Sequence, residues 1–245
     1  MRVSVKLFAR LRDLAGTSDL EERFDGDAVT ISEFARRLGE HVPALQPQLD
    51  CVAFAVNEEY IPNHDTAIHD GDVVALIPPV SGGSDDADRA AGSDVEACPP
   101  FLVTEAVLDR TALRDLVCTP ASGAVVLFEG VVRDHHEGHT VLRLEYEAYP
   151  SMAEKQLEAV AAEVISEYAG REVYSIAAHH RIGTLEIGDI SLLVAVSAAH
   201  RRDAFEAALR VVDRIKETVP VWKKEYGPNG ATWQEGVMPL LRPNE

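Results

Sequence analysis

The sequence predicts an α+β protein of two domains joined by an acidic linker. Three observations support this. The chain has 245 residues, enough for two domains of ordinary size. Both halves contain segments in which apolar and polar residues alternate as in strands, and segments in which apolar residues recur at helical spacing. Between them, residues 84–100 hold one large aliphatic residue, Val95, and bury too little surface to offset the entropy of ordering. We therefore predict domains at 1–83 and 101–245, with a flexible linker at 84–100.

The first domain is predicted to be a small mixed sheet with one helix packed on a face. "VSVKLF" near the start alternates as a strand, and "CVAFAVN" and "DVVALIPPV" are further apolar strands. The Asp70-Gly71 turn introduces the last of them. "TISEFARRLGEHVP" is predicted to be a helix, because Thr30 and Glu33 can form a capping box and Pro43 ends the pattern.

The second domain is predicted to combine long helices with apolar strands. "GAVVLFEGVVRD" and "VLRLEYEAY" have the composition of strands, and "ISLLVAVSA" that of a fully buried strand. "PSMAEKQLEAVAAEVISEYAG" is expected to be a helix with Ser151 and Glu154 as its capping box and Gly170 past its end. A second helix, "HRRDAFEAALRVVDRIKETVP", ends before Pro220, and "GPNG" is a turn between short strands.

Composition excludes several classes of partner. The formal net charge is -18, which disfavours nucleic acids and anionic membranes as partners. No stretch approaches the ~18 apolar residues of a membrane helix, and the start reads as a strand rather than a signal peptide, so we expect a cytoplasmic protein. The three cysteines, Cys51, Cys98 and Cys118, match no metal or redox spacing and are expected to stay reduced.

A lysine of the last helix is a candidate catalytic group. The residues expected to form the buried stripe of this helix are Phe205, Ala208, Leu209, Val212 and Ile215. Lys216 lies four residues after Val212 and seven after Leu209, at the border of that stripe. Partial burial disfavours the ammonium, so the pKa of Lys216 is expected to fall, which suits a nucleophile or base. The alternative is a lysine whose stem is buried and whose head reaches water.

Further cations cluster near the ends of strands. Lys223 and Lys224 lie in a predicted strand and point to opposite faces, so one can face a site; alternatively both belong to a solvated edge strand. Arg133 lies where a strand gives way to a loop, and His200 and Arg201 lie between the buried strand and the last helix.

An anion is the expected partner of these cations. Arg201 at a helix N-terminus opposes the helix dipole, whereas both arginines and helix N-termini favour phosphate. Together with Lys216 and Lys223, the residues Arg133, His200 and Arg201 would form a basic pocket in an acidic protein. Such a pocket favours a small anionic ligand over a polymer.

A metal site and a resident cofactor are not expected. The histidines of "HHEGH", which are His135, His136 and His139, lie in a polar, glycine-containing stretch without a carboxylate or cysteine at standard spacing. We therefore predict a mobile loop rather than a zinc site. The sequence holds no dinucleotide-binding, phosphate-loop or zinc-protease motif, so no tightly bound cofactor is predicted.

These motifs carry a resemblance to molybdopterin synthase. Residues 1–83 resemble its small subunit through "VKLFARLRDLAG" and "DGDVVALIPPVSGG". Residues 101–245 resemble its large, catalytic subunit through "GVVRDHHEG", "YEAYPSMAEK", "HRIGTLEIGD", "SAAHRRDAFEA" and "IKETVPVWKKE". The resemblance implies a ubiquitin-like β-grasp sulfur carrier fused to an α/β-hammerhead-type catalytic domain, which forms a homodimer in that family.

The resemblance also implies an activity. In that family a terminal glycine thiocarboxylate supplies two sulfurs, which convert cyclic pyranopterin monophosphate to the dithiolene of molybdopterin. Matching residues imply a sulfur-bearing Gly83 with Gly82 beside it, a catalytic Lys216 and a second important lysine, Lys223. The residues implied to hold or line the substrate site are Arg133, His200, Arg201, Lys224 and Glu225. Some relatives carry a lysine where this chain has Val131, which leaves contacts there unassigned.

The tail poses a chemical problem. Pro78 and Pro79 restrict the backbone of the segment that leads to Gly82 and Gly83. These two glycines have no side chains, so this segment could enter a narrow channel. Gly83 is joined to Ser84 by a peptide bond, so no carboxylate exists to be activated in the intact chain. We therefore predict cleavage after Gly83 by a processing protease, followed by the action of an ATP-dependent adenylating and sulfurating enzyme.

Two alternatives stay open from sequence. The second domain could be a non-catalytic docking partner for a ubiquitin-like sulfur carrier, or the chain could be an uncleaved fusion that scaffolds a separate synthase. Binding of the pterin by residues 101–245 would exclude the first alternative. A thiocarboxylate at Gly83 would exclude the second.

Overall fold

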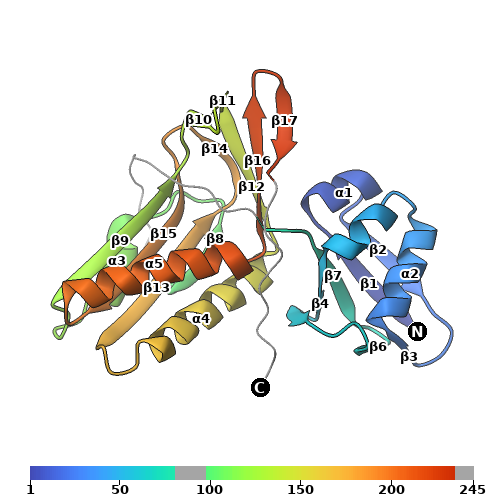
Figure 1. The fold of residues 1–245 in the computed structure, drawn as a ribbon, viewed down its shortest axis with the longest axis horizontal. Coiled ribbons are helices and arrows are strands. Elements are labelled where there is room, and N and C mark those ends of the chain that lie inside the picture. Colours follow the sequence, from blue (N-terminus) through green and yellow to red (C-terminus); the bar gives the residue numbers. More distant parts are fainter. Residues whose placement is uncertain (81–97, 235–245) are drawn as a thin grey trace. The chain divides into compact units, whose positions relative to one another are not determined.

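The computed structural model describes residues 1–80 and 98–234. Their contacts separate into two compact units, one formed by residues 1–80 and the other by residues 98–234 (Figure 1). The Gly82-Gly83 pair and residues 84–97 of the predicted linker lie outside the described residues. None of the described helices is long and apolar enough to span a membrane.

The first unit is a five-stranded mixed sheet with helices packed on it. The strand order is β2-β1-β7-β4-β5, and β1 pairs with β7 in parallel while the other neighbours are antiparallel. The strands are β1 (Arg2–Leu7), β2 (Asp19–Arg23), β4 (Ala53–Val56), β5 (Glu59–Ile61) and β7 (Val73–Ile77). A central parallel pair flanked by antiparallel strands is the β-grasp arrangement that the resemblance implied.

Helix α2 (Ile31–His41) begins where its sequence predicts. The Thr30 hydroxyl accepts a hydrogen bond from the Glu33 amide at 3.2 Å, as a capping residue should. The Glu33 carboxylate pairs with Arg36. Ile31, Phe34 and Leu38 are fully buried in the core of this unit.

Short elements of this unit were not predicted. They are α1 (Ala9–Ala15), the 3₁₀ helix η1 (Gln46–Cys51) and the ladder of β3 (Ala28–Thr30) with β6 (Ala67–His69). Helix α1 has no side-chain cap at its start, so the sequence carries little signal for it. It ends at Gly16, whose φ of 72° is the left-handed conformation that glycine adopts at helix ends.

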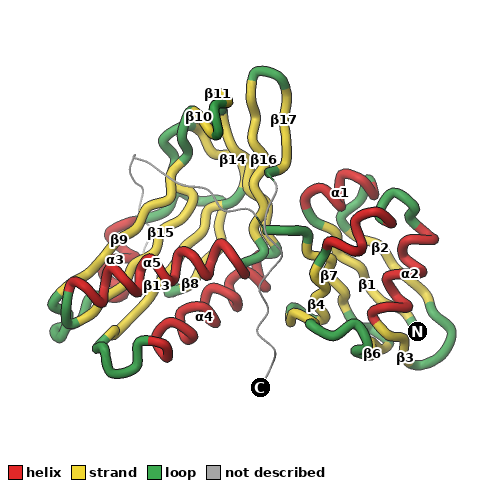
Figure 2. Tube along the Cα trace, viewed as in Figure 1, coloured by secondary structure: helices red, strands yellow, loops and turns green. Residues whose placement is uncertain are grey.

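The second unit contains two four-stranded sheets. One has the order β8-β13-β15-β9, from β8 (Phe101–Thr104), β13 (Val173–Arg181), β15 (Ile190–Ala198) and β9 (Ala124–Val131). The other has the order β14-β12-β16-β17, from β14 (Gly183–Glu186), β12 (Arg143–Ala148), β16 (Val221–Gly227) and β17 (Gly230–Trp233). The predicted "GPNG" turn joins β16 to β17 (Figure 2).

Helices cover both faces of the first of these sheets. Helices α4 (Pro150–Glu167) and α5 (Arg201–Thr218) lie side by side on one face, where Val194 and Val196 of β15 join their core (Figure 1). Helix α3 (Arg110–Val117) packs with Leu193 and Ala195, which point the other way. All nine residues of β15 are therefore buried, which confirms the predicted buried strand.

The predicted cap of α4 is wrong. The helix begins at Pro150, preceded by Tyr149, and it has no side-chain cap. Proline is well suited to the first helical position because its missing N–H needs no partner there. Glu154 instead accepts a hydrogen bond from the Val103 amide of β8 at 2.9 Å. The Ser151/Glu154 spacing is thus used for a tertiary contact of Glu154 rather than for a capping box.

The predicted buried stripe of α5 is also partly wrong. Phe205 and Leu209 are 63% and 64% exposed. The helix buries a face rich in small residues instead: Ala204, Ala207, Ala208, Val211, Val212 and Ile215. Small side chains let α5 lie close to the sheet. The prediction of the buried face relied on large apolar residues and therefore gave too little weight to the alanines. Phe205 and Leu209 remain as an exposed apolar face, called the α5 outer face below.

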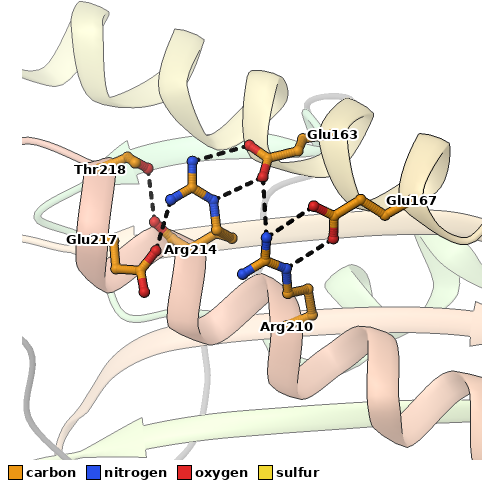
Figure 3. Close-up of polar contacts among 6 residues, drawn as sticks. All are labelled: Glu163, Glu167, Arg210, Arg214, Glu217 and Thr218. Atoms are coloured by element: carbon orange, nitrogen blue, oxygen red, sulfur yellow. Dashed lines mark hydrogen bonds and ion pairs between the residues drawn. The ribbon is translucent and has the colours of Figure 1, made fainter. Parts of the chain in front are cut away.

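Arginines of α5 form ion pairs with glutamates of α4 (Figure 3). Arg214 is buried, and its Nε lies 2.9 Å from Oε1 of Glu163, while its Nη1 lies 2.7 Å from Oε2 of Glu217. Arg210 binds both oxygens of Glu167 at 2.8 Å. Bidentate, partly buried arginine pairs of this kind contribute more to stability than exposed pairs do.

Loss of the Arg214 pairs should destabilise the protein. We expect Arg214→Ala to lower the free energy of unfolding by about 2 kcal/mol, because Glu163 and Glu217 then lose a buried charged partner. The control is Arg202→Ala, since Arg202 is mostly exposed and pairs with Glu206; its cost should be below about 0.5 kcal/mol. Urea unfolding measures both, and equal effects would contradict the assignment.

Candidate functional site

A small pocket lies where the end of β9 meets the second sheet. The residues that line it are Val131, Arg133, His136, Val141, Leu144, Tyr146, Lys223 and Glu225. Leu144 and Tyr146 of β12 point into it because residues two apart share a face of a strand. Lys223 and Glu225 of β16 do so for the same reason, and Lys223 is directly opposite Tyr146 in the antiparallel pair. The pocket thus unites residues that are far apart in the sequence.

The two lysines of β16 face opposite ways, as their adjacency predicts. Lys223 is only 4% exposed, and its Nζ lies 3.1 Å from Oε1 of Glu225. Lys224 is half-buried on the other face, where its Nζ lies 5.0 Å from the centre of the Trp233 ring. The structure therefore brings Lys223 and Glu225 into the pocket together with Arg133, and it does not bring Lys224 there.

Two polar lining residues, His136 and Tyr146, were not predicted to belong to this site. The stretch predicted to be a mobile loop is a hairpin of β10 (His135–His136) and β11 (His139–Thr140), and His136 reaches the pocket from it. Tyr146 is buried, which raises its pKa to about 12, so its hydroxyl stays protonated. The alternation of β12 was a usable signal for Tyr146. No three histidine, cysteine or acidic side chains in the described segments are grouped to hold a metal ion.

The remaining predicted residues lie at the two ends of α5. Lys216 is half-buried in the last turn of the helix, and His200 and Arg201 are exposed at its start. Lys216 comes fifteen positions after Arg201, which corresponds to about 22 Å along a helix. A single copy of the chain therefore does not bring His200 and Arg201 to Lys216. Within one chain the five cations therefore do not form a single pocket, and the expected basic pocket stays a prediction.

Charge pairing distinguishes three cations from the others. In the described part of the second unit, residues 98–234, the side chains of Arg133, Lys216 and Arg201 have no ion pair, hydrogen bond or ring contact with a described residue, whereas nearly every other lysine and arginine there has one. This is notable in a chain with 41 acidic residues and 23 basic ones. Unpaired cations in an acidic protein are available to bind an anionic ligand.

His180 lies behind the pocket and should make stability sensitive to pH. Its ring packs against Tyr146 with 5.2 Å between ring centroids, and burial lowers its pKa from 6.5 to about 4. Between these pH values the unfolded chain binds a proton that the folded chain does not. Stability therefore decreases as the pH falls through this window. From pH 7 to pH 5 the expected loss is on the order of 2 kcal/mol.

Urea unfolding at pH 7 and pH 5 tests this. His180→Phe should lose less stability on acidification than the unchanged protein does. His135→Phe is the control, because His135 is exposed and its side chain pairs with its neighbour Asp134. If His180→Phe keeps the full pH dependence, another group is responsible.

Comparisons with known proteins find a different family for each of the two units. A family model described as MoaE protein matches residues 103–218, and one described as ThiS family matches residues 5–83. The molybdopterin synthase catalytic subunit of Staphylococcus carnosus is 48% identical over 132 residues, which cover 54% of this chain and 85% of that protein. Molybdopterin synthase catalytic subunit 1 of Mycobacterium tuberculosis is 39% identical over 137 residues, which cover 56% of this chain and 91% of that protein.

A solved structure gives the same result for the fold. The crystal structure of molybdopterin synthase from Staphylococcus aureus matches with a TM-score of 0.53 and 39% identity, over 56% of this chain and 98% of that one. The chain therefore belongs to the family of molybdopterin synthase catalytic subunits, enzymes of molybdenum cofactor biosynthesis, and carries a ThiS-family β-grasp domain in the same polypeptide.

Proposed function

We propose that this chain is a molybdopterin synthase that carries its own sulfur donor. Two sulfurs pass in turn, each from the Gly83 thiocarboxylate of a separate carrier tail, to cyclic pyranopterin monophosphate and form the dithiolene of molybdopterin. Each transfer leaves the carrier with a carboxylate, because water takes up the acyl group. The ThiS-family match to residues 5–83 and the catalytic-subunit relatives of the second unit support this pairing.

The observation that carries the proposal is the set of unpaired cations. Arg133, Arg201 and Lys216 were selected from sequence, and they are the three cations of residues 98–234 without a partner among the described residues. A phosphate and developing thiolates are anions that would pair with them. Arg133 lines the pocket, and a domain that only docks a sulfur carrier does not need an unpaired cation there.

The residues have distinct proposed roles. Lys216 acts as base or transient nucleophile on the pterin or on the thiocarboxylate carbonyl. Arg133, His200, Arg201 and Lys223 offset the negative charge of the phosphate and of the sulfur atoms. Glu225 lines the pocket but is itself an anion, so we assign it to Lys223 rather than to the phosphate.

The tail must be freed before it can act. Gly83 is joined to Ser84, and a thioacid can form only on a free carboxyl group. We therefore propose cleavage after Gly83 by a processing protease, followed by adenylation and sulfuration by an ATP-dependent enzyme. Gly82 and Gly83 have no side chains, which suits entry into a narrow channel.

A homodimer would complete the site. Lys216, Phe205 and Leu209 fall on one side of α5 by helical spacing. If this side packs against its copy in an antiparallel sense, with the two-fold axis level with residues 208 and 209, then Arg201 of a second copy faces Lys216. Such an isologous contact also covers the α5 outer face, whose Phe205 and Leu209 are exposed in the single chain.

Mixing two inactive variants tests this proposal. Lys216→Ala and Arg201→Ala should each be inactive or strongly impaired alone. In an equal mixture that has exchanged subunits, about a quarter of the sites hold both native residues, so activity should return to about a quarter of the normal value. If both residues served one chain's own site, no mixture would recover. Absence of recovery after verified exchange would contradict the shared site.

A further inference from the structure

The hairpin that follows β9 places one histidine in the pocket and leaves its neighbour outside. His136 is mostly buried and lines the pocket, whereas His135 is exposed and lies 2.6 Å from Asp134. The hairpin turns through Glu137 and Gly138, both at positive φ. It is held close to β16, because an added Cβ on Gly227 would lie 3.0 Å from the Thr140 carbonyl oxygen. The position of His136 is thus set by the hairpin.

One carboxylate oxygen connects His136 to the buried lysine. Nδ1 of His136 lies 3.0 Å from Oε1 of Glu225, and Nζ of Lys223 lies 3.1 Å from the same oxygen. All three side chains are largely removed from water. A carboxylate between two nitrogens at these distances fixes both of them more firmly than either single contact does.

The carboxylate has a positioning role rather than a binding role. An anionic side chain beside an anionic substrate would repel it, unless cations or hydrogen-bond donors offset its charge. His136 and Lys223 both do so here. A lysine side chain has several rotatable bonds, and an anchored carboxylate restricts where its ammonium lies. An unanchored Glu225 would not restrict it.

We infer that His136 is a positioning residue, which holds Glu225 so that Glu225 holds the Lys223 ammonium toward the pocket. The inference deepens the proposed function and rests on it for the reaction concerned. His136 makes no contact with substrate in this role. Its effect on the reaction passes through Glu225 to Lys223. The position of the Lys223 ammonium can also be measured in the absence of catalysis.

Four variants of the full-length protein separate this role from a general structural one. His136→Asn keeps an N–H donor near the place of Nδ1, whereas His136→Gln places its donor farther out, near the place of Nε2. His136→Ala removes the donor. His135→Ala is the matched control on the same hairpin, because His135 is exposed and contacts Asp134.

In the processed, sulfur-loaded protein, His136→Ala should lower kcat by on the order of tenfold and leave KM within about twofold, since the ammonium is displaced while other cations still bind substrate. His136→Asn should restore most of the rate, His136→Gln less, and His135→Ala should match the unchanged protein. In a Glu225→Gln background, His136→Ala should cause little further loss, because the path through the carboxylate is already broken. A full additional loss there, or equal effects of His135→Ala and His136→Ala, would overturn the inference.

A spectroscopic measurement keeps this test separate from the proposed function. The chain has only five lysines, so the side-chain nitrogen signals of isotopically labelled lysine can be assigned one by one. His136→Ala should move the Lys223 signal and leave those of Lys6 and Lys155 in place, and His136→Asn should return it toward its original position. An unmoved Lys223 signal would overturn the inference even in an active enzyme. A moved signal in a protein without synthase activity would support it while the proposed function failed.

Discussion

Lys216→Ala should abolish sulfur transfer and leave the fold intact. We expect the rate of dithiolene formation to fall by more than about a thousandfold, as expected when a nucleophile or base is removed. The free energy of unfolding should stay within about 1 kcal/mol of its normal value, because Lys216 is only half-buried and alanine is the best helix former. Among the described residues, Lys216 also has no ion pair that the substitution would break.

The matched control for this variant is Lys155→Ala. Lys155 lies on the exposed side of α4, and its removal tests the general effect of losing one of five lysines in an acidic chain. Product formation by the sulfur-loaded protein, followed together with urea unfolding, measures both properties. Near-normal dithiolene yield from Lys216→Ala would refute its catalytic role, whereas a comparable loss in Lys155→Ala would point to charge rather than position.

Substitution of the tail glycines should have an effect of similar size. We expect Gly82→Val and Gly83→Val to lower dithiolene formation by more than about a hundredfold, because a branched side chain blocks a narrow channel and restricts the extended backbone. Gly92→Val is the control, since Gly92 lies in the predicted linker, beyond the proposed cleavage point.

Mass spectrometry of the same variants shows which step fails. A variant that is still cleaved and sulfur-loaded but does not transfer sulfur has a blocked tail. One that is never loaded has lost recognition by the activating enzyme. If Gly82→Val and Gly83→Val both support normal dithiolene formation, the tail assignment is wrong.

The spacing of apolar residues predicted the strands, and the capping residue predicted the start of α2, because both features depend on residues that are close in sequence. The nine apolar residues of β15 are buried on both faces, and Thr30 caps α2 as expected. The α4 cap failed because Glu154 is used by the Val103 amide of β8, a contact between segments far apart in sequence. No local rule reports such competition.

The site was predictable in part. Alternation along β16 correctly separated Lys223 from Lys224, and the strand end placed Arg133 in the pocket. Residue spacing does not report distances along α5, so Arg201 and Lys216 were assigned to one pocket although about 22 Å of helix separates them within one chain. The role of His136 could not be predicted, because it depends on how a short hairpin lies against β16.

One experiment tests the central claim, which is that a freed glycine tail of this chain delivers sulfur to the catalytic domain. Residues 1–83 with a thiocarboxylate at Gly83 are mixed with residues 84–245 and the pterin precursor, and the mass of the carrier and the yield of dithiolene are followed together. We expect the carrier to exchange its sulfur for oxygen as dithiolene appears, with two carriers consumed for each product. The account is contradicted if the carrier keeps its sulfur, or if the uncleaved chain, with Ser84 still attached to Gly83, forms dithiolene equally well.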